Sequence, residues 1–183
     1  DNDSAPALSI NDVTTSNENA ANATFTVTAT APFSSAVTVD YSTSNGTGTA
    51  GSDYTATTGL LTFAAGETSK TLVVPILSDT VDENNETVTV TLSNASNASI
   101  SDASGTLTIT DDDNPSSLSI DDVGGSDGVA NTGSFTVSLG SASGKEVTVD
   151  YTTSDGSAVA GSDYATTNGS LTFAAGETSK SID

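Results

Sequence analysis

The sequence predicts an all-β chain that folds into two tandem antiparallel sandwiches, and three observations support this prediction. Apolar and polar residues alternate with a period of two over a series of short segments, which is typical of strands with one buried face. Gly, Asn, Asp and Ser separate these segments, as expected of turns. No segment carries the period of an amphipathic helix.

The strands can be justified in chain order within the one complete copy of the repeat. Seven short alternating strands within about 100 residues are the pattern of an immunoglobulin-like antiparallel β-sandwich. Their inward-facing residues are Leu8 and Ile10; Phe25 and Val27; Val37, Val39 and Tyr41; Leu61 and Phe63; Leu72, Val74 and Ile76; Val88, Val90 and Leu92; and Leu107 and Ile109.

An internal repeat with an offset of 118 − 8 = 110 residues organises the chain. Residues 8–13 (LSINDV) return as residues 118–123 (LSIDDV), and residues 61–70 return unchanged as residues 171–180. We therefore expect residues 1–3 to be the tail of a preceding repeat, 4–113 a complete domain and 114–117 a linker. Residues 118–183 are expected to form a second domain that lacks its last strands.

The charge balance excludes several classes of function. The chain has 24 acidic residues against 3 lysines, no His and no Cys, and a formal net charge of -21. Nucleic acid and anionic membrane surfaces require a basic face, so neither is an expected partner. Zinc sites and disulfides are excluded, and the usual catalytic bases and thiols are missing, so we do not expect an enzyme. No apolar run is long enough to insert into a membrane.

Acidic residues are concentrated in particular connections between the expected strands. Of the thirteen acids in residues 4–113, nine lie in the odd-numbered connections or directly after the last strand. Odd-numbered connections share one end of an antiparallel sandwich, so these carboxylates should gather there and repel one another. Calcium fits such a set best, because it accepts six to eight oxygen ligands in flexible geometry.

Four segments, in order, resemble the Calx-beta family. They are residues 40–54 (DYSTSNGTGTAGSDY), 61–67 (LTFAAGE), 79–86 (DTVDENNE) and 108–113 (TITDDD). The resemblance covers essentially all of both copies. It implies a calcium-binding β-sandwich of the kind found in sodium–calcium exchangers, an integrin cytoplasmic region and large bacterial surface proteins.

The resemblance also implies a set of calcium ligands in this chain. In the first domain these are Glu18, Asp53, Asp79, Glu83, Glu86, Asp111, Asp112 and Asp113. The family often has a second Asp before Asp79, whereas this chain has Ser78, which puts one calcium subsite in doubt. In the second domain only Asp127 and Asp163 match, so a full site is not expected there.

Each of these segments also has a simpler interpretation. The run of three acids at residues 111–113 is also what a solvated acidic linker looks like. Residues 79–86 are compatible with an ordinary exposed loop, and they lack the central Gly of an EF-hand loop. Residues 51–54 (GSDY) form a plausible turn whether or not Asp53 binds a metal ion.

Two functions remain for a repetitive calcium-binding sandwich. The first is a calcium-stiffened spacer or adhesion module of an extracellular or cell-surface protein, with neighbouring repeats as partners and other surface proteins or glycans as further ones. The alternative is a calcium-sensing regulatory module of a membrane-associated transporter or signalling protein. A glycosidase built from paired carboxylates is disfavoured, because aromatic residues are too few to line a sugar site.

Overall fold

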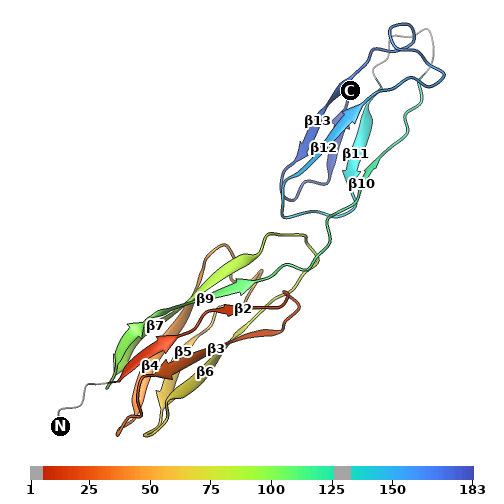
Figure 1. The fold of residues 1–183 in the computed structure, drawn as a ribbon. Coiled ribbons are helices and arrows are strands. Elements are labelled where there is room, and N and C mark those ends of the chain that lie inside the picture. Colours follow the sequence, from red (N-terminus) through yellow and green to blue (C-terminus); the bar gives the residue numbers. More distant parts are fainter. Residues whose placement is uncertain (1–5, 126–132) are drawn as a thin grey trace. The chain divides into compact units, whose positions relative to one another are not determined.

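The computed structural model describes residues 6–125 and 133–183, and every regular element within these ranges is a β-strand (Figure 1). The predicted all-β sandwich fold is therefore confirmed. Over the same ranges, no helix is long and apolar enough to cross a membrane. Contacts within the chain define two compact units, Asp1–Thr80 with Asn84–Asp112 and Val81–Glu83 with Asp113–Asp183. Each unit is described by itself.

The first unit consists of two facing sheets (Figure 1). One sheet holds, in spatial order, β6 (Ser69–Pro75), β3 (Asn22–Ala29), β1 (Ala7–Ile10) and β8 (Ser99–Asp102). The other holds β2 (Val13–Thr14), β9 (Ser104–Ile109), β7 (Glu86–Ser96), β4 (Val37–Asn45) and β5 (Thr58–Phe63). The seven expected strands are all present, as β1, β3, β4, β5, β6, β7 and β9.

The first strand differs from the prediction because it is shared between the two sheets. The chain bends at Asn11 and Asp12, so that β1 pairs with β8 and the short β2 pairs with β9, both in parallel. The bend is held by side chains: Asn11 Oδ1 accepts a hydrogen bond from the Thr26 amide (2.6 Å) and Asp12 Oδ1 accepts one from the Thr106 amide (2.7 Å). Both sheets are thereby tied to the start of the domain.

Between the sheets lies a core formed by the predicted inward-facing residues. Four fully buried residues of this core are Phe25 on β3, Val39 on β4, Phe63 on β5 and Leu107 on β9. Both sheets contribute, because β3 belongs to one sheet and the other three strands belong to the other. Phe33 packs edge-on against Phe63, with ring centroids 6.0 Å apart. Burial of such side chains is the main stabilising term of a sandwich of this size.

The second unit repeats only part of this arrangement in the residues that the structure describes. A three-stranded sheet holds β10 (Leu118–Ile120), β11 (Phe135–Leu139) and β14 (Ser179–Ile182). A two-stranded sheet holds β12 (Val147–Thr152) and β13 (Asn168–Phe173). Among the described residues, its buried apolar core is limited to Val137, Leu139, Phe173 and Ile182.

Candidate metal centre

The first group of acids forms where the end of β9 meets β2. Thr110 is bonded to Thr15 twice: its amide donates to Thr15 Oγ1 (3.0 Å) and its hydroxyl donates to the Thr15 carbonyl (2.9 Å). These bonds fix the chain directly before Asp111. Carboxylate oxygens of Glu18, Asp111 and Asp113 then lie within 4.8 Å of one another. Glu18 is buried and the other two are half-buried, so water screens their repulsion poorly.

The second group joins the loop after β4 to the loop before β7. Carboxylate oxygens of Asp53, Glu83 and Glu86 lie within 4.8 Å of one another. Glu86 is the first residue of β7, and Glu83 stands three residues before it in the same loop. The group therefore links two connections that are about thirty residues apart in the chain.

A rigid turn positions Asp53. Gly51 has a φ of 96°, a conformation that residues with a Cβ rarely adopt. Asp53 Oδ2 accepts a hydrogen bond from the Thr49 amide (2.6 Å), which closes the turn. The next residue, Tyr54, is buried in the core and its hydroxyl donates to Asn45 Oδ1 (2.8 Å). Residues 51–54 thus form the expected turn, and the same backbone conformation also places Asp53 where it could bind a metal ion.

Two predicted ligands fall outside both groups. Asp112 accepts two hydrogen bonds from Asn19 Nδ2, at 3.1 and 3.0 Å. Asp79 lies beside the first group, because its amide donates to Glu18 Oε1 (3.2 Å). The structure therefore brings together six of the eight acids named from the sequence in the first domain, and these two border the groups.

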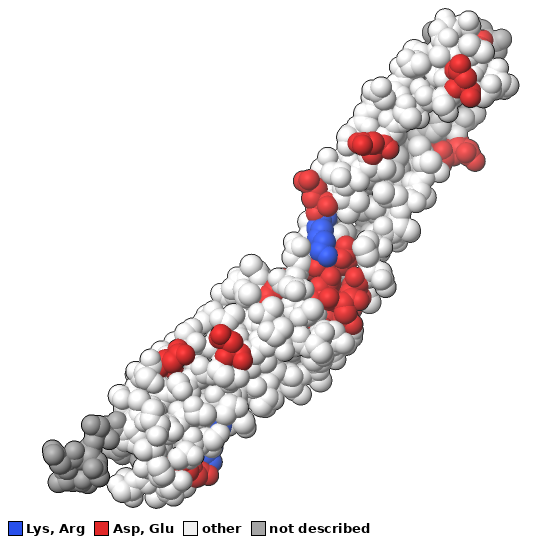
Figure 2. Space-filling view, viewed as in Figure 1, with Lys and Arg blue, Asp and Glu red and all other residues white. Residues whose placement is uncertain are grey.

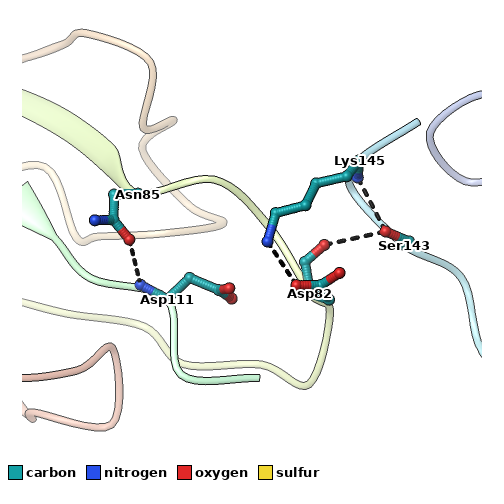
Figure 3. Close-up of polar contacts among 5 residues, drawn as sticks. All are labelled: Asp82, Asn85, Asp111, Ser143 and Lys145. Atoms are coloured by element: carbon teal, nitrogen blue, oxygen red, sulfur yellow. Dashed lines mark hydrogen bonds and ion pairs between the residues drawn. The ribbon is translucent and has the colours of Figure 1, made fainter. Parts of the chain in front are cut away.

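Asparagine side chains support the site in a role that no sequence pattern predicts. Asn85 Oδ1 accepts a hydrogen bond from the Asp111 amide at 3.1 Å (Figure 3). This contact ties the β6–β7 loop to Asp111, the second residue after β9. Asn85 lies in an irregular loop, where neither period nor spacing distinguishes a structural amide from a solvated one.

Asp82 belongs to neither group of acids and forms an ion pair with a lysine instead. The tip of its loop, Val81–Glu83, belongs to the second compact unit. Within that unit Lys145 Nζ donates to Asp82 Oδ1 (2.5 Å), and the Asp82 carbonyl accepts from Ser143 Oγ (3.2 Å) (Figure 3). The Asp82 carbonyl also accepts from the Gly144 amide (3.0 Å). The Asp82 carboxylate is thus neutralised by a lysine.

The donor set of the first domain fits a hard divalent cation. Figure 2 shows one dense patch of acidic side chains at the end of the first unit where β9 stops, and isolated acids elsewhere on the same face. Asp113 Oδ2 is buried without a hydrogen-bond partner, although buried carboxylate oxygens are almost always paired. All six converging side chains offer oxygen and none offers nitrogen or sulfur, which suits calcium.

The second domain lacks an equivalent group among its described residues. Asp163 repeats the turn of Asp53, since its Oδ2 accepts from the Val159 amide (2.8 Å), but no set of three acids includes it. Asp127 lies outside the described residues. Neither residue is evidence for a second site.

Fold and site together define a class of protein: tandem β-sandwich domains with converging carboxylates on the loops at one end. The family described as "Calx-beta domain" matches residues 1–113 and 122–183. The chain belongs to the Calx-beta family, and the resemblance seen in the sequence is confirmed. The first match contains all six converging acids.

Relatives and solved structures agree with this assignment. The chain is 42% identical over 69 residues to sodium/calcium exchanger 1 of Canis lupus familiaris, a match that spans 38% of this chain and 7% of the exchanger. It resembles the apo form of the Calx CBD1 domain, with 25% identity, a TM-score of 0.56 and coverage of 60% of this chain and 100% of that one. It also resembles calcium binding domain CBD12 of CALX1.1, with 25% identity, a TM-score of 0.55 and coverage of 96% and 73%.

The comparison with exchangers corrects one expectation. An extracellular or cell-surface location is part of the spacer or adhesion function expected from the sequence, and the absence of Cys was read as compatible with it. In the sodium/calcium exchangers that this chain resembles, the homologous Calx-beta domains lie in a cytoplasmic loop. The expectation was wrong because a lack of cysteine is equally compatible with a reducing compartment.

Proposed function

We propose that this chain is a calcium-binding regulatory module, in which the first domain holds calcium between its loops. The observation that carries the proposal is the convergence of six carboxylates into two groups of three. The expected ligands are Glu18, Asp111 and Asp113 in one group and Asp53, Glu83 and Glu86 in the other.

Calcium would change the mechanics of the loops that supply these ligands. In its absence, like charges within 4.8 Å push the loops apart. A bound cation reverses the sign of that interaction and cross-links the β2–β3 loop to the end of β9, and the β4–β5 loop to the β6–β7 loop. Since calcium binds only the assembled loops, it stabilises the folded domain and orders this end of it.

The similarity to exchangers supports regulation rather than adhesion. Sequence similarity links the chain to a membrane transporter, which favours a calcium-sensing module of a membrane-associated protein. The two-domain CBD12 of CALX1.1 supports a neighbouring repeat as the partner within the chain. The comparisons give no support to surface proteins or glycans as partners, nor to the spacer function. Membership of a family of calcium-binding regulatory domains also supports the expectation that the chain is not an enzyme.

Calorimetric titration of calcium into chelator-treated protein tests the proposal. We expect saturable binding, weakened at least about tenfold by Glu18→Gln in the first group and by Asp53→Asn in the second. Asp102→Asn is the matched control, because Asp102 is exposed on β8 and belongs to neither group. It removes the same charge and should leave the affinity unchanged.

Hydrogen exchange then separates a sensor from a passive metal site. Calcium should slow amide exchange in residues 15–21, 46–57 and 77–86 of the wild-type protein but not of the double variant Glu18→Gln, Asp53→Asn. Absence of binding, or binding that the control weakens as much as the site variants do, would refute a calcium site at these groups. Binding without slower exchange would refute the regulatory part alone.

A further inference from the structure

The first unit has one sheet edge that its sequence leaves unprotected. Edge strands present unpaired N–H and C=O groups, and proteins usually block them with charges, prolines, short strands or covering segments. β5 (Thr58–Phe63) is the last strand of the five-stranded sheet and pairs with β4. Its sequence, TGLLTF, contains no charged residue and no proline. Within residues 6–125 and 133–183, no strand pairs with its other edge.

The other edge strands of this unit are all protected in one of these ways. β2 has two residues, and β8 has four and ends in Asp102. β6 contains Lys70 and ends at Pro75. The end of β6 is also covered, because the Thr55 amide donates to the Pro75 carbonyl (2.9 Å). Among the described strands of the unit, β5 is therefore the exception.

The main chain of β5 directs alternate residues toward its open edge. The Thr43 amide of β4 donates to the Thr57 carbonyl directly before β5 (2.9 Å). Hydrogen-bonded pairs alternate along an antiparallel ladder, so Thr58, Leu60 and Thr62 point their N–H and C=O groups away from β4. The side chains of these three residues lie on the outer face of the sheet, where Leu60 is 58% exposed.

These three residues make the edge self-complementary. Their order, Thr–Leu–Thr, reads the same in both directions about Leu60. In antiparallel pairing of two such strands, Leu60 faces Leu60 of a second copy and Thr58 faces Thr62, and both kinds of pair are favourable across strands. The second repeat has Asn168, Ser170 and Thr172 at the equivalent positions, which lack both the leucine and the symmetry.

The charge distribution also suits contact between two copies at this edge. A chain with a net charge of -21 repels its own copies, so a contact surface between them has to be free of charge. Asp40 lies opposite Leu60 on β4, but its Oδ2 accepts a hydrogen bond from Asn94 Nδ2 of β7 (2.9 Å). Since β7 pairs with the opposite edge of β4, this bond holds the carboxylate away from the open edge.

We propose that two copies of the chain associate through antiparallel pairing of β5 with β5, about a two-fold axis at Leu60. The pairing joins the two five-stranded sheets into one continuous sheet through main-chain hydrogen bonds, as in β-strand addition. A contact limited to one strand edge buries little surface, so the dimer is weak and reversible. Salt strengthens it, because the repulsion between the acidic copies is screened.

Sedimentation velocity of the whole chain over a concentration series, in chelator, measures the association. We expect a reversible monomer–dimer equilibrium that shifts toward dimer as salt is added. Hydrogen exchange locates the contact: the amides of Leu60 and Thr62 should exchange more slowly as protein concentration rises. The amides of Ser170 and Thr172, at the equivalent edge positions of β13, are the internal control and should not change.

Substitutions at Leu60 test the geometry. Leu60→Pro removes an amide that points away from β4, so it should abolish the dimer and leave the fold intact, as circular dichroism would check. Leu60→Ser gives β5 the residue of β13 and should weaken the dimer at least about tenfold. Val73→Ser is the matched control, because Val73 is 43% exposed on β6 and should not affect association. Leu60→Lys, which brings two charges together at the axis, replaces the proline variant if that variant unfolds.

Three outcomes would overturn the proposal. The first is a chain that stays monomeric at high concentration and high salt. The second is a dimer in which slower exchange appears elsewhere and not at β5, because another surface would then form the contact. The third is a dimer that Leu60→Ser and Val73→Ser weaken equally, since the contact would then not depend on the leucine at the proposed axis.

Discussion

Single residues that differ between the two copies act as natural substitutions. Asn45 and Asp155 occupy the same position, and each accepts hydrogen bonds from a tyrosine hydroxyl and a backbone amide. Only Asp155 can titrate. The hydrogen bond from Tyr164 (2.7 Å) lowers the pKa of the Asp155 carboxyl below its usual range, with a further contribution from the Ala160 amide. The same bond raises the pKa of Tyr164.

The change Tyr164→Phe should return the pKa of Asp155 toward its ordinary value, because the carboxylate loses its strongest donor. Carboxyl NMR titration measures this directly. Since the folded pKa is depressed, the stabilising contribution of Asp155 is present above its unfolded pKa of about 3.9 and is lost as pH falls through the folded pKa. Tyr54→Phe is the control, because its partner Asn45 does not ionise. An unchanged Asp155 titration in Tyr164→Phe would contradict the assignment.

Asp113 has a buried carboxylate oxygen, and we expect its substitution to change the free energy of unfolding in opposite directions without and with calcium. Without calcium, Asp113→Asn should raise the free energy of unfolding by about 1 kcal/mol, because an amide donor replaces a charge beside Glu18 and Asp111. In saturating calcium the same variant should be less stable than the wild type, since a ligand is lost. Urea denaturation in chelator and in calcium measures both values.

The control for this pair of measurements is again Asp102→Asn, which should shift stability by less than about 0.5 kcal/mol in either condition. If Asp113→Asn were less stable than the wild type in chelator, Asp113 would have a stabilising partner in the absence of metal. The unpaired Asp113 Oδ2 would then no longer support a metal site.

At the scale of elements, sequence period identified the long strands but not the short ones. Strands such as β3 and β7 carry several alternating apolar residues and were predicted with their inward faces correct. The two-residue β2 and the four-residue β8 were missed, because β8 has one apolar residue, Ile100, and no period can be read from it. Their pairing depends on the bend at Asn11, a contact between distant segments.

The candidate site was predictable to a similar degree and for a related reason. Carboxylates are distinctive in a sequence, and the parity of connections assigns them to one end of a sandwich, so six of the predicted acids do converge. The resemblance could not show that Asp112 turns to Asn19, or that Asp82 pairs with Lys145. Those contacts depend on loop conformations that carry no repeating signal. Metal ligation itself stays a prediction.

Close packing between β9 and β1 gives a prediction for one glycine. A Cβ on Gly105 would lie 2.6 Å from the Asn11 carbonyl oxygen and 3.1 Å from the Phe25 ring. Backbone at the sheet-switching bend cannot move without loss of its hydrogen bonds, so Gly105→Ala should destabilise the first unit by about 1–3 kcal/mol. Denaturant unfolding measures the loss.

Gly124→Ala is the matched control, because none of the described residues has an atom within 4 Å of its added Cβ. The same substitution there should be neutral or slightly stabilising, through lower entropy of the unfolded chain. Equal effects at the two glycines would mean that β9 does not approach the bend as closely as the structure has it.

At the scale of the whole molecule, the two copies have near-identical strand sequences but differ in where acids converge. The first unit encloses one core between its two sheets, and the described part of the second has a smaller buried cluster of its own. Both groups of converging acids fall in residues 1–113, within the first match to the family. Calcium and the second core therefore belong to different domains.

This division predicts calorimetric unfolding in two transitions, of which calcium raises only one. At calcium about 100-fold above the dissociation constant, the domain of residues 4–113 should gain about 2.7 kcal/mol, a rise of roughly 10 °C in its midpoint. Phe173→Ala, which removes a fully buried ring from the second core, should lower only the calcium-insensitive transition. If calcium raised both midpoints equally, the second domain would have to contribute ligands of its own, and the assignment of the site to the first domain alone would fail.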